Sequence, residues 1–146
     1  MNKADALAAD VLVEEGRKRA WFTADIPVGS SSAPYVFYSV SPASAALAMN
    51  KTHGGWSVNI LSEQTPSNLS PDERAQILSG SSEPLTSVPE KVELYFKHLT
   101  AYGKFSLKNL PEAITSIKNV ELTAGMPIAG QWFYNVEDGT MESNGA

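Results

Sequence analysis

The apolar positions near the start of the chain follow a helical spacing. They recur at i, i+3, i+4, i+7 and i+8, which places them on one face of an α-helix. These positions are Ala4, Leu7, Ala8, Val11 and Leu12. Asn2 can cap the start of such a helix, and Gly16 suits its end. We therefore predict an N-terminal amphipathic helix.

Beyond this helix, apolar residues alternate with polar ones or give way to β-branched and aromatic runs. Both patterns are typical of strands. Strands are expected over residues 20–28, 35–40, 56–60, 120–124 and 131–136. Gly29 and the serines after it favour a turn, so the first two strands are expected to pair as an antiparallel hairpin.

Helix-start signals mark the centre of the chain. Ser70, Pro71 and Glu73 have the spacing of a capping box, which predicts a helix over residues 70–78. A longer helix is expected over residues 88–102, with Phe96 in its buried stripe. Shorter helical stretches are expected over residues 43–49 and 109–117.

The expected strands are grouped in pairs and do not alternate singly with helices. This grouping favours an α+β fold, in which helices pack on a mostly antiparallel sheet of about five strands. The length of 146 residues suits one domain spanning residues 1–146, with residues 142–146 frayed. The N-terminal helix and the central helical segment are expected to pack on the sheet.

Composition excludes several functional classes. The chain has no cysteine, which excludes thiol catalysis and disulfide frameworks. The net charge of −5 and the single short basic run at residues 17–19 argue against nucleic-acid binding. No segment resembles a membrane span or a signal peptide, which slightly favours a cytoplasmic location.

No set of polar residues has the spacing of a known catalytic or metal-binding site. His53 lies between Thr52 and Gly54 in an expected loop, where an imidazole can reach a ligand or simply contact solvent. His98 lies on the expected long helix without a carboxylate one turn away. We therefore expect no metal, no cofactor and no catalytic residue, and a non-enzyme is favoured over an enzyme.

Aromatic residues are the remaining candidates for a binding surface. Trp21, Trp56 and Trp132 all lie on expected strands, and Tyr134 follows Trp132 by two positions. In the pairs Trp21-Phe22 and Trp132-Phe133, adjacent residues face opposite sides of the sheet. One ring of each pair should therefore face outward, unless helices cover both faces of the sheet.

Two functions are consistent with these residues. The first is a soluble, non-catalytic protein-binding domain, such as an inhibitor, immunity-type factor, adaptor or secretion chaperone. Its binding residues would be Trp21, Trp56, Trp132, Tyr134 and His53, its partner another protein, and a homo-oligomer is left open. The second is a small-molecule binder or cofactor-free enzyme with a pocket between the sheet and the long helix. A flat aromatic patch favours the first, and a deep closed pocket favours the second.

Overall fold

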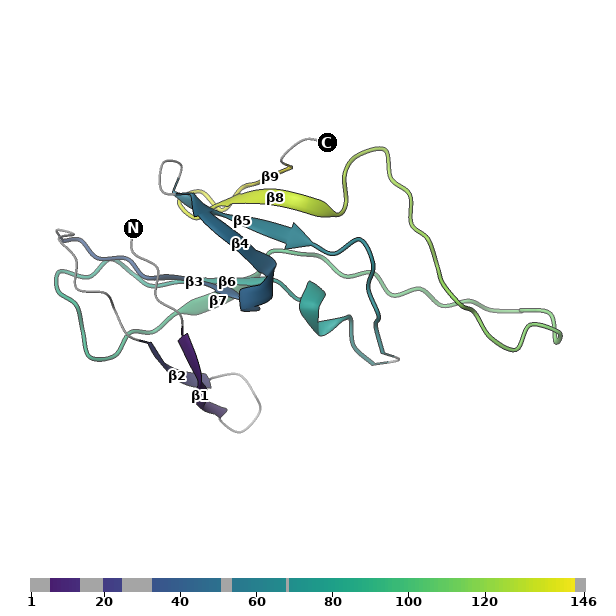
Figure 1. Ribbon diagram of the computed structural model, residues 1–146, viewed down its shortest axis with the longest axis horizontal. Helices are drawn as coiled ribbons and strands as arrows, with labels where there is room; N and C mark the ends of the chain where they lie inside the picture. Colours follow the sequence, from purple (N-terminus) through teal and green to yellow (C-terminus); the bar gives the residue numbers. More distant parts are fainter. Residues whose placement is uncertain (1–5, 14–19, 25–32, 51–53, 68, 144–146) are drawn as a thin grey trace. The chain divides into compact units, whose positions relative to one another are not determined.

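The computed structural model describes residues 6–13, 20–24, 33–50, 54–67 and 69–143 (Figure 1). The chain forms two compact units. Unit 1 comprises Met1–Tyr35 and Pro84–Glu90, and unit 2 comprises Val36–Glu83 and Lys91–Ala146. Each unit is described by itself below.

Unit 1 contains one antiparallel pair of strands, β1 (Ala6–Val13) and β2 (Ala20–Ala24). Tyr35 and Leu85, from the two segments of the unit, form a separate antiparallel bridge. In it, each backbone N–H donates to the other residue's carbonyl, at 2.7 and 2.8 Å. This unit is therefore also built on strand pairing in its described residues.

The predicted N-terminal helix is wrong, because its described residues form β1. Its helical stripe contained two alanines, which bury little apolar surface, and a short helix without strong packing is only marginally stable. Val11 and Val13 favour extended backbone. Pairing with β2 satisfies the backbone instead, with Leu7 opposite Thr23 and Leu12 opposite Trp21.

Unit 2 holds two antiparallel sheets and two single turns of 3-10 helix. One sheet has the order β3-β6-β7, and the other has the order β4-β5-β8-β9. The first contains β3 (Tyr38–Ser41), β6 (Leu78–Ser81) and β7 (Tyr95–His98). The second contains β4 (Ala46–Asn50), β5 (Gly55–Ile60), β8 (Gly130–Asn135) and β9 (Met141–Ser143). The turns are η1 (Ala43–Ala45) and η2 (Glu73–Ala75).

The α+β class is therefore wrong: the described residues are mostly sheet. The predicted helix over residues 70–78 shrinks to η2, whose cap is Asp72, because the Asp72 carboxylate accepts a hydrogen bond from Arg74 N. Ser70 is not the cap, since its own N–H donates to Ser67 Oγ. The remaining residues up to Leu78 pass directly into β6.

The predicted helix over residues 88–102 is also wrong, because its middle forms β7. Tyr95 and Phe96 are bulky aromatic residues that favour strands. In a strand they point to opposite faces, and Phe96 is 43% exposed, not buried in a helical stripe. The expected helix over residues 109–117 is a single turn closed by Ile114 N–H to Pro111 O.

Some of the predicted strands are correct in position, but the predicted pairing of strands is wrong. Residues 56–60 and 131–136 do form β5 and β8. The expected hairpin of the first two predicted strands is wrong, since β2 pairs with β1 and β3 pairs with β6. Residues 120–124 form no strand, and the expected helix over 43–49 is η1 followed by β4. Residues 142 and 143, expected to be frayed, belong to β9.

The core of unit 2 lies on one face of the four-stranded sheet. Trp56 pairs with Tyr134 across β5 and β8, and Val58 pairs with Trp132 beside them. Trp56, Val58 and Tyr134 are buried, and residues from both sheets pack against them. These neighbours are Val40, Ala46, Leu99, Trp132, Val136 and Met141. Cross-strand pairs of large side chains are the usual source of stability in such a sheet.

Candidate functional site

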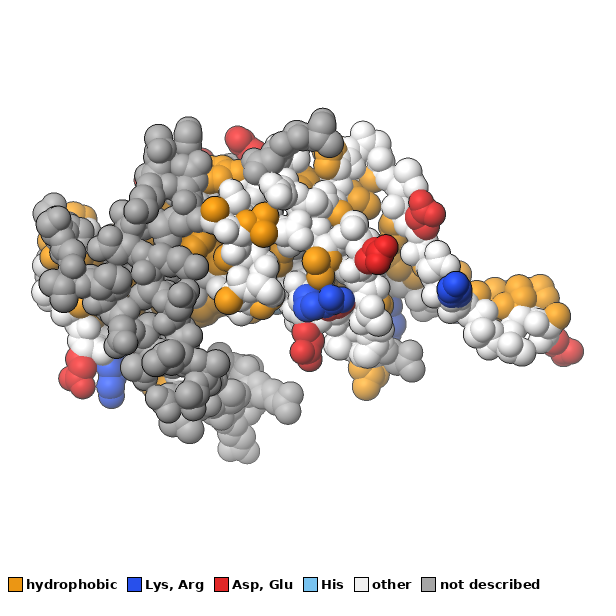
Figure 2. All heavy atoms as spheres, viewed as in Figure 1, with side chains coloured by type: hydrophobic (Ala, Val, Ile, Leu, Met, Phe, Trp, Pro, Cys, Tyr) orange, Lys and Arg blue, Asp and Glu red, His pale blue; other side chains and the backbone are white. Residues whose placement is uncertain are grey.

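Residues 101–128, between β7 and β8, contain no strand or helix, and every one of them is exposed. We call this segment the arm. It holds ten large apolar side chains that are exposed, more than the rest of the described residues together. They are Tyr102, Phe105, Leu107, Leu110, Ile114, Ile117, Val120, Leu122, Met126 and Ile128. Figure 2 shows hydrophobic side chains on the surface of this segment.

The sequence of the arm explains why it forms no regular element. Gly103, Pro111, Gly125 and Pro127 interrupt it at both ends and near the middle. Asn109 adopts a left-handed backbone conformation with φ of 57°, which ends any extended run before Pro111. The apolar stretches between these breaks are too short to form a helix or strand that packs on the rest of unit 2, so their side chains stay exposed.

The two ends of the arm meet at a cavity of about 340 Å3. Ala101 and Tyr102 line it from the first end, and Pro127 and Ile128 from the second. The other lining residues come from the strands and from the loops beside η2. They are Ile60, Gln64, Ala75, Leu99, Thr100, Trp132 and Met141. We call this region the arm base.

Hydrogen bonds fix the first end of the arm to the body of unit 2. Leu99 N–H donates to Ile77 O at 2.8 Å, and Thr100 Oγ1 donates to Ala75 O at 3.0 Å. The Tyr102 hydroxyl lies 3.2 Å from Thr100 Oγ1 and 3.0 Å from His98 Nδ1. The rings of His98 and Tyr102 also meet edge to face, with centroids 5.4 Å apart. The arm therefore leaves the sheet from a defined position.

The structure brings together three of the aromatic residues that the sequence singled out, but as core residues. Trp56 is 7% exposed and Tyr134 is 2% exposed, and Trp132 packs against both. The indole Nε1 atoms of Trp56 and Trp132 are buried and have no hydrogen-bond partner among the described residues. Trp132 and Phe133 are neighbours on β8 and both are half-buried, so neither ring of this pair is exposed.

The other two predicted binding residues lie elsewhere. Trp21 belongs to unit 1 and is 45% exposed, and the side chain of its neighbour Phe22 lies outside the described part. His53 lies outside the described residues. A common surface of Trp21 and Trp132 therefore stays a prediction. The long helix that was expected to wall a pocket is replaced by β7 and its flanking loops.

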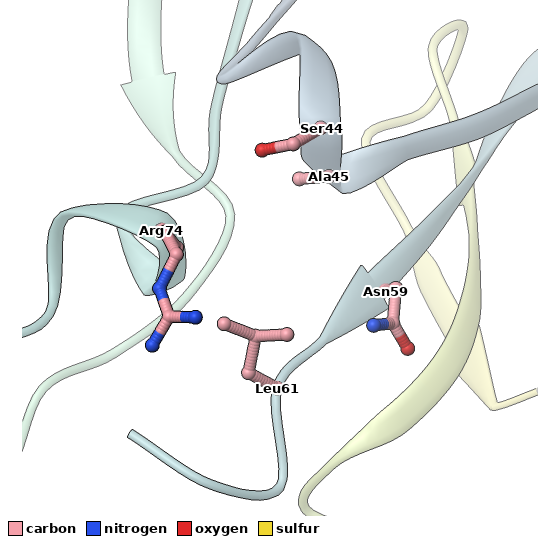
Figure 3. A pocket seen from close by; sticks show the side chains of 5 residues that line it. All are labelled: Ser44, Ala45, Asn59, Leu61 and Arg74. Atoms are coloured by element: carbon pink, nitrogen blue, oxygen red, sulfur yellow. The ribbon is translucent and has the colours of Figure 1, made fainter. Parts of the chain in front are cut away.

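A smaller cavity of about 100 Å3 lies beside η2 (Figure 3). Its lining is Ser44, Ala45, Asn59, Leu61 and Arg74. The Arg74 guanidinium is held by the buried Asp72 carboxylate through Nε at 3.1 Å and Nη2 at 2.6 Å. The same carboxylate accepts from Thr65 N–H at 2.8 Å. These bonds hold the pKa of Asp72 well below its usual range, with the Arg74 side chain the largest cause.

Asp72 and Arg74 therefore act as a structural clamp between the 61–67 loop and η2. Because the guanidinium is already engaged by two bonds to one carboxylate, it offers little to an anion. The cavity beside it has room for only a few water molecules. We assign it no ligand.

The turn between β8 and β9 carries an acidic cluster. Asp138 accepts from the Thr140 hydroxyl at 2.7 Å and from Thr140 N–H at 2.9 Å, and Asn135 Nδ2 donates to it at 3.1 Å. The Thr140 hydroxyl is the main reason why the pKa of Asp138 is lowered. Glu137, Asp138 and Glu142 are exposed around this turn. The three carboxylates outnumber the one cation described at this turn, Lys97, whose Nζ lies 2.9 Å from the β-carbon position of Gly139, so this end of the sheet keeps a net negative charge.

The described part of the chain holds no cluster of metal-ligating residues and no membrane-spanning helix. No group of three or more histidine, aspartate or glutamate residues there is placed to hold a metal ion. Among the same residues, no helix is long and apolar enough to cross a membrane.

Sequence reasoning missed the arm, although a signal for it was present. Six of its ten large apolar residues were divided among three expected elements, over residues 88–102, 109–117 and 120–124, and the other four were assigned to none. Four glycine or proline breaks within 28 residues were the signal that no regular element would hold them.

Comparison with protein-family models, curated proteins and solved structures finds no match.

Proposed function

We propose that this protein is a non-catalytic protein-binding domain and that the arm is its binding element. One observation carries the proposal: ten large apolar side chains are exposed along a single segment that has no regular structure. Scattered apolar residues are normal on protein surfaces, but a contiguous set of this size marks an interaction site. The apolar character of the arm matches a protein surface better than a charged or sugar ligand.

The size of this apolar surface supports a protein partner. With each side chain about half exposed, the arm presents on the order of 1,000 Å2 of apolar-residue surface. The largest apolar patch on an ordinary monomer is roughly 300–600 Å2, whereas one side of a standard protein interface covers about 800 Å2. The arm is thus large enough to form a specific interface by itself.

The rest of unit 2 supports this role as a scaffold. Its paired strands and buried aromatic cluster hold both ends of the arm at the arm base. A segment presented in this way keeps its ends fixed while its middle adapts to a partner surface. Part of the binding free energy is then spent on ordering the segment, which favours large interfaces of moderate affinity.

The proposal is tested with a photo-cross-linking amino acid at Phe105 in the full chain, expressed in the source cells. The expected result is a covalent adduct with another polypeptide, lost when Leu107 is also changed to Asp. The same cross-linker at Leu69, which is 98% exposed but lies outside the arm, is the matched control. Cross-links confined to the chain that carries the label would contradict the proposal, because the arm would then pack on its own body.

A second candidate function rests on the arm base. Its volume of about 340 Å3 lies at the lower end of the range for small-molecule sites, and most of its lining is apolar. Its Thr100 hydroxyl already donates within the protein, so an apolar ligand suits it better than a polar one. Titration with small apolar molecules while following tryptophan fluorescence tests this candidate. Saturable quenching that disappears in Tyr102→Ala supports it, and linear quenching in both proteins rules it out.

A further inference from the structure

The strand β9 is an edge strand of the four-stranded sheet. Among the described strands it pairs only with β8, so the backbone groups on its other side have no strand partner. Such an edge can accept an extended segment of another chain as an additional strand. The edge also has a defined pattern. Met141 lies opposite Tyr134 on the core face, and Glu142 lies opposite Phe133 on the other face.

One stretch of the arm has the complementary pattern. In residues 104–108, Lys104, Ser106 and Lys108 alternate with Phe105 and Leu107. If this stretch is extended, its two apolar side chains share one face and its two lysines share the other. Beside β9, the apolar face would continue the surface of Met141, and the lysines would lie near Glu142.

The charges of the chain divide in the same way. The arm has three lysines and two glutamates, a net charge of +1, within a chain of net charge −5, which leaves −6 on the rest. Glu137, Asp138 and Glu142 concentrate part of that negative charge at the β8–β9 turn and the β9 edge. Opposite charges on neighbouring strands stabilise their pairing, and like charges oppose it.

We propose that the 104–108 stretch of one copy adds to the β9 edge of a second copy of this chain. The inference rests on the proposed function, because it names the protein that the arm binds. Each copy has both an arm and a β9 edge, so two copies can exchange arms about a twofold axis and satisfy both.

The main competitor is the β9 edge of the same chain. Tyr102 and Met141 both line the arm base, so the start of the arm lies near its own β9. In the single chain the 104–108 stretch is nevertheless exposed throughout. The experiment must therefore separate pairing within one chain from pairing between two chains.

The absence of cysteine from the chain makes that separation possible with disulfides. Ser106→Cys is placed in one preparation and Glu142→Cys in a second that carries a larger tag, and the two are mixed and oxidised. The expected product is the mixed-size disulfide dimer, at least tenfold more abundant than with Leu69→Cys in place of Ser106→Cys. Light scattering of the chain without cysteine is expected to give the mass of a dimer.

A charge exchange tests the pairing in solution. Changing Lys104→Glu and Lys108→Glu together should raise the dimer dissociation constant. We expect roughly a two- to fivefold rise for each lysine–Glu142 pair that is lost. Glu142→Lys alone should do the same, and the three changes together should restore dimerisation. Far-UV circular dichroism identifies any variant that fails to fold, and Leu107→Asp provides a second route to the monomer.

The outcomes distinguish this inference from the proposed function. The mixed disulfide together with rescue by charge exchange supports the inference. A disulfide that forms only when Ser106→Cys and Glu142→Cys are placed in one chain, and only within that monomeric chain, overturns both proposals. A monomer that forms neither disulfide, but whose Phe105 cross-linker still captures a different polypeptide, overturns this inference and leaves the proposed function standing.

Discussion

Gly55 in β5 and Gly80 in β6 each lie beside an aromatic ring of the neighbouring strand. A β-carbon on Gly80 would lie 2.9 Å from two atoms of the Phe96 ring. A β-carbon on Gly55 would overlap the Tyr134 carbonyl oxygen and lie 2.5 Å from Phe133 Cζ. The first contact is with a side chain that can turn away, whereas the second is with backbone that cannot.

Gly55→Ala should therefore destabilise the protein more than Gly80→Ala does. We expect a loss of at least about 1–3 kcal/mol for Gly55→Ala, because the strands must separate locally. Gly80→Ala should lose less, since the half-exposed Phe96 ring can move. Gly125→Ala is the control, as no atom lies within 4 Å of its β-carbon position, and its change should be within about 0.5 kcal/mol. Urea unfolding midpoints at constant slope measure all three, and equal effects at Gly55 and Gly125 would refute the geometry.

Asp138 is the titratable residue that organises the β8–β9 turn. Hydrogen bonds from Thr140 stabilise its ionised form, so its pKa in the folded protein is lower than the usual 3.8. The sign of the linkage follows: the ionised carboxylate stabilises the fold above pH 3.8, and this contribution is lost as the pH falls through the lowered pKa.

Thr140→Val removes the hydroxyl that is the largest cause of this shift while keeping the shape of the side chain. The pKa of Asp138 should rise toward 3.8 but stop short of it, because Thr140 N–H still donates a bond. An NMR titration of the Asp138 side-chain carboxyl carbon measures the change. Thr100→Val, which changes a hydroxyl at the arm base, should leave this titration unaltered. A pKa of Asp138 unmoved by Thr140→Val would mean that the turn is held in another way.

At the scale of the element, the sequence predicted strands where the two faces differ clearly. Trp56, Val58 and Ile60 alternate with polar residues and form β5, because one face meets the core and the other faces solvent. Tyr95 and Phe96 follow Val92 by three and four positions, which is also the spacing of a helical stripe. The same residues therefore fitted a helix and a strand. Pairing with β6 decided the outcome, and local spacing cannot report on pairing.

The arm could not be predicted as an element, because apolar spacing shows only that a segment prefers to be covered. Ile114 and Ile117 fit a helix, and Val120 and Leu122 fit a strand. In the single chain neither stretch finds a surface to pack against, so neither forms.

Exposed backbone without regular hydrogen bonding is readily cleaved, which gives a test of the arm itself. Under limiting trypsin, the monomeric Leu107→Asp variant should be cleaved after Lys104, Lys108 and Lys118 in the arm before it is cleaved after Lys97 in β7. Mass spectrometry of early fragments identifies the order. Cleavage after Lys97 first would show that the arm is packed and β7 is not.

At the scale of the molecule, the pairing of the strands is set by contacts between distant residues. β3 pairs with β6 and β5 pairs with β8, across intervals that contain other elements. Four of the five predicted binding residues are described, and three of those belong to one core cluster. Sequence spacing could not show that Trp56 and Tyr134 pack against Val40 of the three-stranded β3-β6-β7 sheet.

The position of both arm ends at one cavity has a consequence for how this protein can change. Since both ends of the arm lie at one cavity, a short Gly-Ser linker can replace residues 104–125 and still join them. Loop closure changes by only about 0.6 kcal/mol per doubling of length, so the shortened chain should have a thermal midpoint within a few degrees of that of the monomeric Leu107→Asp variant. Calorimetry measures that midpoint, and its collapse would show that the arm is part of the core. If the rest of unit 2 folds without depending on the length of the arm, the sequence of the arm can change, and with it the binding specificity, without loss of the fold.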